Sequence, residues 1–322
     1  MRKQSRALAH GFTLIEMAIV LVIAGVAAAL LLNASSGILD SQKRLAARTK
    51  LDTIDAALAN FVAINKRLPC PADGTIASGA LGAGLETLSN GPPPGSATPK
   101  GTCNPISQQN GVLPWATLGL TEEDGQDPWN GRFTYRVDPA LAGGAPLPLL
   151  MNMSDCDPAS TGATGAAGIC KTPVTPCTGN ANCTSPTNFL AGKGLDVWDG
   201  KNAAAGFLAR QNNRPAGTGA AYVVISHGPS GRGAFNTTGG LLPQTGSIPA
   251  GTNESPNLNG QVIVLVATQA NAYRDALLND NPTPPVLPPL PPVPGPHFDD
   301  YLSHPSIMTV LNRANLGPRA HN

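Results

Sequence analysis

A nearly unbroken apolar stretch close to the N-terminus constrains this chain more than any other feature. Residues 12–32 read FTLIEMAIVLVIAGVAAALLL, and only Thr13 and Glu16 among them are polar. A helix of about 20 apolar residues spans the hydrocarbon core of a bilayer. We therefore predict a membrane-spanning helix over residues 12–34. Glu16 is its unusual member, because an ionisable side chain in an apolar span costs free energy and generally serves a function.

The residues before the apolar stretch form a short basic leader. Residues 1–11 contain three basic residues and no acid, and they end at Gly11. An ordinary secretory signal has a shorter apolar segment and is cut after it, and residues 34–36, Ala-Ser-Ser, offer such a cleavage site. A disposable signal has no need of Glu16. We therefore expect the cut to fall before the apolar stretch, with residues 1–11 removed.

The hexapeptide GFTLIE at residues 11–16 resembles the signature of type IV prepilins and type II secretion pseudopilins. The resemblance covers roughly residues 1–35. It implies that the prepilin peptidase cuts after Gly11 and methylates the new N-terminal amine of Phe12. It also implies that Glu16 pairs with the Phe12 amine of a neighbouring subunit during assembly.

The same resemblance implies a location and a set of partners. The precursor is expected in the bacterial inner membrane with its head in the periplasm, and later in a periplasmic or extracellular filament. The implied partners are other pilin or pseudopilin subunits, the prepilin peptidase, the inner-membrane assembly platform and membrane lipid. Nucleic acid is not an expected partner, because the net charge is only +1 and there is no cluster of Lys and Arg to neutralise phosphates.

Two residues of the apolar stretch have more than one physical interpretation. Opposite charges in a low dielectric each lose hydration and persist only when they meet, which favours pairing of Glu16 with an amine. Alternatively, Glu16 lies near the interface and extends to water. Gly25 lowers helix propensity by about 1 kcal/mol relative to Ala. It is interpreted either as a point of local melting during assembly or as a close helix contact.

The helical pattern continues beyond the apolar stretch. An apolar stripe at spacings of three and four residues predicts an amphipathic helix over residues 35–67, and the stripe consists of Leu51, Ile54, Leu58 and Phe61. Pro69 should end the helix, because it disfavours helical geometry at Leu68. One long helix is therefore expected from Phe12 to about Arg67, with its second half forming part of the head.

Residues 68–322 are predicted to form a globular head. Strand patterns occur at residues 132–137, 221–226 and 261–267, too few and too scattered for a βαβ array. The predicted fold class is α+β, in which the long N-terminal helix packs on an antiparallel sheet with long Gly- and Pro-rich loops. Nine prolines in residues 282–296 predict an extended polyproline segment, either a linker or a docking strip.

Six cysteines indicate disulfides in an oxidising compartment. None forms a C-x-x-C pair, and the last four are separated by 13, 6 and 5 residues, unlike the short paired spacings of structural zinc sites. Their pairing stays open, since six cysteines allow 15 connectivities. The disulfide candidates are Cys70, Cys103, Cys156, Cys170, Cys177 and Cys183.

A second, weaker resemblance lies in the head. Residues 127–135, DPWNGRFTY, are similar to the Asp-Pro-Trp-Gly turn and following strand of pseudopilin heads, although Asn-Gly stands where that pattern usually has Gly-Asn. Major pseudopilins often bind calcium nearby through carboxylates and carbonyls. Oxygen atoms for such a site are offered by residues 122–127, including Asp127, or by Asp196 and Asp199, although neither segment spells a calcium loop. No other cofactor is expected.

One segment invites an enzymatic interpretation. Residues 226–233, SHGPSGRG, place a serine and a histidine among glycines at the end of a predicted strand. They match neither a G-x-S-x-G elbow nor a phosphate-binding loop, and the histidines of the chain lack metal-ligand spacing. A glycine-rich turn leaving a buried strand explains the segment better, so we predict that the protein is not an enzyme.

The predicted function is therefore a structural subunit, a minor pilin or pseudopilin of a type IV pilus or a type II secretion system. Two alternatives remain. In the first, the apolar helix is only an anchor for a periplasmic binding protein or enzyme. In the second, the chain is a secreted adhesin that ordinary signal peptidase cuts after Ser36.

Overall fold

The computed structural model describes much of the chain in two compact units, Met1–Ala46 and Ala47–Asn322. The described residues are 14–89, 101–104, 111–143, 151–154, 168–169, 176–177, 193–199, 207–209, 219–242, 254, 257–259, 273–276, 278 and 298–319. For residues 27–38, 168–169, 176–177, 199, 207–209 and 274, only the backbone is described.

Helix α1 runs from Leu14 to Asn65 without a break. Its end lies within two residues of the predicted position at Arg67. Lys66 adopts a left-handed backbone with φ of 58°, and its N–H donates to the carbonyl of Val62 at 2.8 Å. This residue closes the last turn before Pro69 directs the chain away.

A five-stranded antiparallel sheet forms the centre of the second unit, in the order β1-β2-β3-β8-β10. Its strands are β1 (Ala72–Asp73), β2 (Gly111–Val112), β3 (Thr134–Val137), β8 (Tyr222–Ser226) and β10 (Tyr301–Ser303). The α+β class is thereby confirmed, as are the strands predicted around 132–137 and 221–226. The strand predicted over 261–267 lies outside the described residues.

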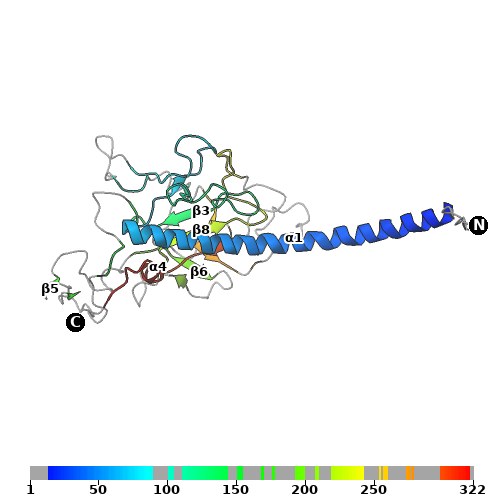
Figure 1. Cartoon of the computed structure of the whole chain (residues 1–322). Coiled ribbons are helices and arrows are strands. Elements are labelled where there is room, and N and C mark those ends of the chain that lie inside the picture. The colour runs from blue at the N-terminus through cyan, green and yellow to red at the C-terminus, as the bar shows by residue number, and fades with distance from the viewer. Residues whose placement is uncertain are drawn as a thin grey trace, which may run out of the picture. The chain divides into compact units, whose positions relative to one another are not determined.

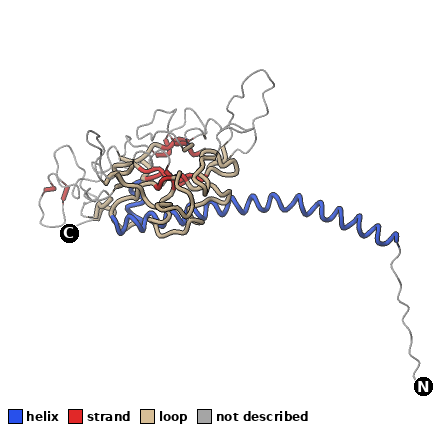
Figure 2. The backbone as a smooth tube through the Cα atoms, turned by 90° about the horizontal axis from the view of Figure 1, so that it is seen from above, coloured by secondary structure: helices blue, strands red, loops and turns tan. Residues whose placement is uncertain are grey.

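The main core lies between α1 and one face of this sheet (Figure 1). Figure 2 shows the strands gathered beside the C-terminal turns of the helix. Alternation along β3 and the residue before it directs Phe133, Tyr135 and Val137 toward this core, as the sequence pattern predicts. The short helix α4 (Ile307–Arg313) adds three buried apolar side chains to it. Helix α1 contributes Ala47, Leu51, Ile54, Leu58 and Val62 to the same core.

The predicted apolar stripe of α1 includes one wrong residue, Phe61. Leu51, Ile54 and Leu58 are buried as expected, but Val62, with 0% exposure, continues the stripe. Phe61 is only half-buried, and the guanidinium of Arg67 lies 5.2 Å from its ring centroid. An α-helix turns 100° per residue, so after Leu58 the next core-facing position falls four residues on.

A buried carboxylate also joins α1 to the sheet. Asp55 is 8% exposed and accepts hydrogen bonds from the Tyr222 hydroxyl at 2.8 Å and the Ser303 hydroxyl at 2.8 Å. The guanidinium of Arg313 on α4 lies 3.4 Å away. Burial, followed by the Asp55 charge, raises the pKa of Tyr222. Asp55 therefore connects the helix to two strands and to α4.

The opposite face of the sheet packs against further strands. Val223 and Ile225 of β8 join a second apolar cluster with Leu195, Val197 and Tyr273. Val197 and Tyr273 belong to a three-stranded sheet of order β7-β6-β9, and Leu195 lies just before its strand β6. Strand β6 (Val197–Asp199) pairs antiparallel with β7 (Phe207–Ala209) and parallel with β9 (Tyr273–Asp275). A separate antiparallel pair is formed by β4 (Gly168–Ile169) and β5 (Pro176–Cys177).

Cys70 and Cys103 form a disulfide. Both residues are buried in the main core, so this pair confirms that the cysteines include a disulfide. Cys177 lies in β5 with its side chain undescribed, and the remaining three cysteines lie outside the described residues.

Removing this disulfide should destabilise the head. The bond closes a loop of 33 residues, for which the chain-entropy relation gives a loss of about 3–4 kcal/mol. We expect the Cys70→Ser, Cys103→Ser double variant of the full-length chain to lose that amount of unfolding free energy in denaturant titrations. Reduced wild-type protein serves as the control and should show a similar loss. An unfolding midpoint that is insensitive to both changes would contradict a stabilising role.

Across the part of the chain that the structure describes, no helix combines the length and apolar character needed to cross a membrane. The membrane segment predicted over residues 12–34 includes residues 12–13 and the side chains of 27–34, which lie outside that part. Its membrane-spanning role stays a prediction.

Candidate functional site

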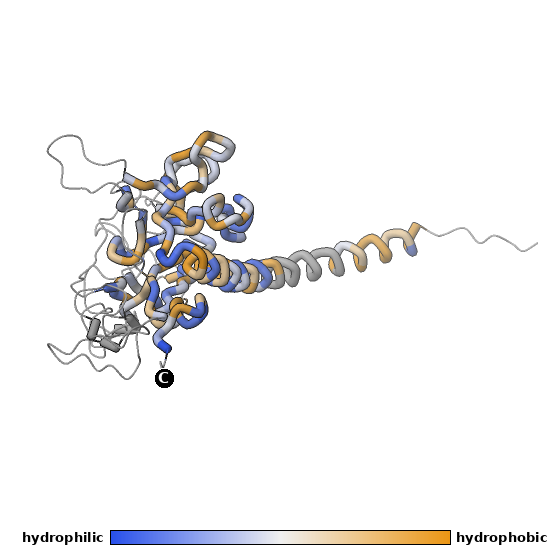
Figure 3. The backbone as a smooth tube through the Cα atoms, turned by 60° about the vertical axis from the view of Figure 1, so that its left-hand side comes forward, coloured by the Kyte–Doolittle hydropathy of each residue, from blue (hydrophilic) through white to orange (hydrophobic). Residues whose placement is uncertain are grey.

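The first described turns of α1 expose an almost wholly apolar surface. Leu14 is 92% exposed and Ile15 is 69% exposed, and Figure 3 shows this end of the helix in the colours of hydrophobic residues. The other exposed large apolar residues of this stretch are Met17, Ile19, Val20, Leu21, Val22, Ile23 and Val26. A helix that is apolar all round is normally covered by lipid or by other protein.

Glu16 is the charged member of this surface. It is exposed and lies in the first described turn of α1, where the helix dipole favours negative charge. Gly25 lies within the helix, and a Cβ added there would meet nothing within 4 Å. Among the described residues, no contact of Gly25 therefore requires a glycine. The predicted cleavage site at Gly11 and Phe12 lies outside the described residues.

A second group of functional candidates lies in the head, where the chain turns sharply after β8. Gly228 adopts φ of +56°, and a Cβ there would lie 2.1 Å from the backbone oxygen of Asp299. The N–H of Gly231 donates back to the carbonyl of His227 at 3.0 Å. These observations confirm that residues 226–233 form a glycine-rich turn leaving a buried strand. The turn places His227 and Ser230 directly against the segment that enters β10.

Asp127 organises the neighbouring turn. Its Oδ1 accepts the N–H groups of Trp129 at 3.0 Å and Gly131 at 2.8 Å, and its Oδ2 accepts the Ser226 hydroxyl at 2.7 Å. Burial raises the pKa of Asp127, and these three hydrogen bonds oppose the rise. The Asn-Gly order fits this turn because Asn130 itself takes the left-handed conformation, with φ of 68°.

A group of three buried carboxylates lies next to the turn after β8. Oxygen atoms of Glu254, Asp299 and Asp300 lie within 4.8 Å of one another. Asp299 accepts hydrogen bonds from the backbone N–H and the hydroxyl of Ser230, at 2.8 and 3.0 Å. Burial raises the pKa of Asp300, while His227 and Asn257 nearby oppose the rise. We call Glu254, Asp299 and Asp300 the carboxylate cluster.

A buried hydrogen-bond network continues from His227 across the sheet. Its Nε2 lies 2.8 Å from the Thr134 hydroxyl, which accepts from Nδ2 of Asn259 at 2.6 Å. Oδ1 of Asn259 accepts from the guanidinium of Arg136 at 2.7 Å. Burial lowers the pKa of Arg136, and contact with Tyr273 opposes this effect. The network fixes the orientation of His227 in the interior of the head.

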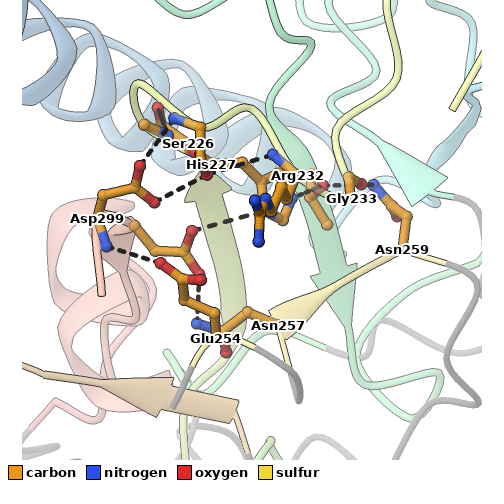
Figure 4. Close-up of polar contacts among 12 residues, drawn as sticks. Ser226, His227, Arg232, Gly233, Glu254, Asn257, Asn259 and Asp299 are labelled. Atoms are coloured by element: carbon orange, nitrogen blue, oxygen red, sulfur yellow. Dashed lines mark hydrogen bonds and ion pairs between the residues drawn. The ribbon is translucent and has the colours of Figure 1, made fainter. Parts of the chain in front are cut away.

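The carboxylate cluster, with Glu254 and Asp299 labelled in Figure 4, contains none of the sequence-predicted calcium candidates. Asp127 closes the turn described above, Asp196 is 4% exposed just before β6, and the side chain of Asp199 lies outside the described set. Among the described residues, the group with metal-ligand geometry contains none of the three. Glu254, Asp299 and Asp300 were missed. The adjacent Asp299-Asp300 pair was the signal available in the sequence, because Glu254 has no other acidic residue near it along the chain.

Comparison with known families identifies the N-terminal segment. Residues 6–32 match the Prokaryotic N-terminal methylation motif, a prepilin-type signal that is typical of type IV pilins and pseudopilins. The match confirms the resemblance based on GFTLIE. Comparisons with characterised proteins and with solved structures each found no match to the chain.

Proposed function

We propose that this chain is a type IV pilin-like subunit that anchors in the inner membrane and then assembles into a filament through α1. The observation that carries the proposal is the methylation motif at residues 6–32, which ends in a helix whose apolar side chains are exposed on the isolated chain. Lipid in the membrane, and then neighbouring helices in the filament, would cover that surface.

In this proposal, prepilin peptidase cuts between Gly11 and Phe12 and methylates the Phe12 amine. The amine and the carboxylate of Glu16 then carry opposite charges on the apolar ends of neighbouring subunits. Each loses several kcal/mol of hydration in a low dielectric, so each is stable there only beside an opposite charge. Pairing between subunits therefore favours one register of assembly.

The finer role that we propose is a minor subunit of a type IV pilus or a type II secretion system. The head from residue 68 onward is larger than a major subunit needs, and it carries long Gly- and Pro-rich segments. We propose no catalytic activity, because the serine and histidine of residues 226–233 are engaged in a turn and a structural network. The head stays in an oxidising compartment, in agreement with the buried Cys70–Cys103 bond.

Dependence on prepilin peptidase tests the proposal. The chain should be shortened in cells that express the peptidase and should stay full-length in matched cells without it, as followed by immunoblot of membrane fractions. Only the shortened form should enter the sheared filament fraction. If the chain has the same length with and without the peptidase, the proposed function is contradicted. That result would favour an ordinary membrane anchor or an ordinary secretory signal.

A further inference from the structure

The chain contains the acceptor pattern for N-linked glycans, which is Asn-x-Ser or Asn-x-Thr with any residue except proline in the middle. The pattern occurs five times, at Asn33, Asn152, Asn182, Asn236 and Asn253. A pattern this short also arises by chance, so the sequence alone selects none of them. The structure describes both the asparagine and the hydroxyl side chain for two of the five, at residues 152–154 and 236–238.

Residues 236–240, with the sequence NTTGG, form a turn at the surface of the head. The N–H of Asn236 donates to the carbonyl of Gly240 at 2.9 Å and closes the turn. The carbonyl of Thr237 accepts the N–H of Ser78 at 2.7 Å, which ties the turn to a neighbouring loop. The first of these patterns to be compared therefore lies in an ordered and accessible turn.

The side chain of Asn236 is held through its oxygen. Its Oδ1 accepts hydrogen bonds from the N–H of Thr238 at 3.0 Å, the hydroxyl of Thr238 at 2.8 Å and the N–H of Gly240 at 2.9 Å. Within the part of the chain that the structure describes, Nδ2 of Asn236 donates no hydrogen bond. The hydroxyl that defines the acceptor pattern thus contacts the amide, and the amide nitrogen is left for chemistry.

Asn152 has the same local geometry in a different environment. Its Oδ1 accepts the N–H of Ser154 at 3.1 Å and the hydroxyl of Ser154 at 2.8 Å. The residue between them, Met153, is fully buried in the main core, and its N–H donates to the carbonyl of Leu316 at 2.9 Å. Access to this pattern requires the core to open, whereas access to Asn236 requires only a surface turn to open.

We propose that Asn236 is the acceptor of an N-linked glycan, transferred from a lipid-linked sugar pyrophosphate outside the cytoplasmic membrane. In this reaction Nδ2 of Asn236 attacks C1 of the first sugar and forms a C–N bond. The bond between C1 and the pyrophosphate oxygen breaks, and the lipid pyrophosphate leaves with the electron pair. The amide gives up one proton to a base of the transferase, and no oxidant or reductant is consumed.

The inference rests on the proposed function in one respect, the export of the head from the cytoplasm. The buried disulfide between Cys70 and Cys103 agrees with that compartment. A glycan at Asn236 would also lie beside exposed apolar surface, because Leu241 directly follows the turn and is 40% exposed. Since glycans are bulky and solubilising, loss of the glycan should leave the head folded and lower its solubility.

Mass spectrometry of the protein recovered from the membranes of its natural host tests the inference. Trypsin should release residues 233–274 as one peptide, because they contain no Lys or Arg before Arg274. Fragmentation that keeps the glycan attached then separates Asn236 from Asn253. We expect a glycan on Asn236 and none on Asn152. A bare Asn236, or a sugar on the hydroxyl of a neighbouring threonine, would overturn the assignment.

Matched variants test the acceptor pattern. Thr238→Ala removes the required hydroxyl and should abolish the modification, whereas Thr238→Ser keeps the hydroxyl and should remain modified. Thr237→Ala removes the adjacent hydroxyl, which lies outside the pattern, and should be modified like wild type. Thermal unfolding of the three variants checks that each head is folded. Equal modification of Thr238→Ala and Thr238→Ser would show that Asn236 is not the acceptor.

The same spectra separate this inference from the proposed function. A chain that begins at Phe12 and carries no glycan would overturn the acceptor site and leave the pilin-like processing intact. A glycosylated chain that retains Met1 would support the acceptor site and contradict the processing.

Discussion

Replacing Glu16 with alanine is expected to reduce incorporation of the chain into filaments by about tenfold or more, while the head stays folded and the precursor stays in the membrane. The variant leaves the Phe12 amine of a neighbouring subunit without its proposed partner. Removing one partner of a buried ion pair costs about 3–5 kcal/mol, and about 1.4 kcal/mol already corresponds to tenfold. The measurement is the ratio of the chain in the sheared filament fraction to the chain in the membrane fraction.

Asp52→Ala provides the matched control for this experiment. It removes one acid from the same helix at an exposed position, in the part of α1 that belongs to the head unit. Incorporation of this variant should equal that of wild type. Normal incorporation of Glu16→Ala would remove Glu16 from the assembly mechanism.

Replacing Asp55 with alanine is expected to lower the free energy of unfolding of the head by about 3 kcal/mol. The change leaves the Tyr222 hydroxyl without its acceptor in a fully buried position, and the Ser303 hydroxyl and Arg313 lose theirs. Hydrogen bonds to charged groups contribute about 1.5–3 kcal/mol, and unsatisfied buried groups add to the loss. Denaturant unfolding of the full-length chain, followed by tryptophan fluorescence, measures the change.

Asp52→Ala is again the control, because it removes the same charge from an exposed position of the same helix. Asp52→Ala lies three residues away on the same helix, where a surface substitution should change stability by less than about 0.5 kcal/mol. Equal effects of the two substitutions would show that Asp55 does not join the helix to the sheet.

The long helix and the sheet could be predicted because their signals are local. Residues 12–32 are apolar except for Thr13 and Glu16, Leu51, Ile54 and Leu58 follow helical spacing, and Pro69 marks the end of the helix. The alternating pattern around residue 133 likewise indicates a strand with one core-facing side. These features depend on neighbours a few residues apart, and the structure confirms them.

The interior polar groups could not be predicted because they depend on long-range register. Asp55 on a helix face looks like a solvated acid until Tyr222 and Ser303 are placed opposite it. The carboxylate cluster likewise brings Glu254 beside residues 45 and 46 positions later. The partner of Cys70 was one of several choices by spacing, and the fold selects Cys103.

The most direct test of the central claim is the intact mass and N-terminal sequence of the protein recovered from membranes. We expect a chain that begins at Phe12, lacks residues 1–11 and carries one additional methyl group on its N-terminal amine. The same start should appear in the filament fraction. A chain that begins near Gly37, or one that retains Met1, would contradict processing at Gly11 and the assembly mechanism that depends on it.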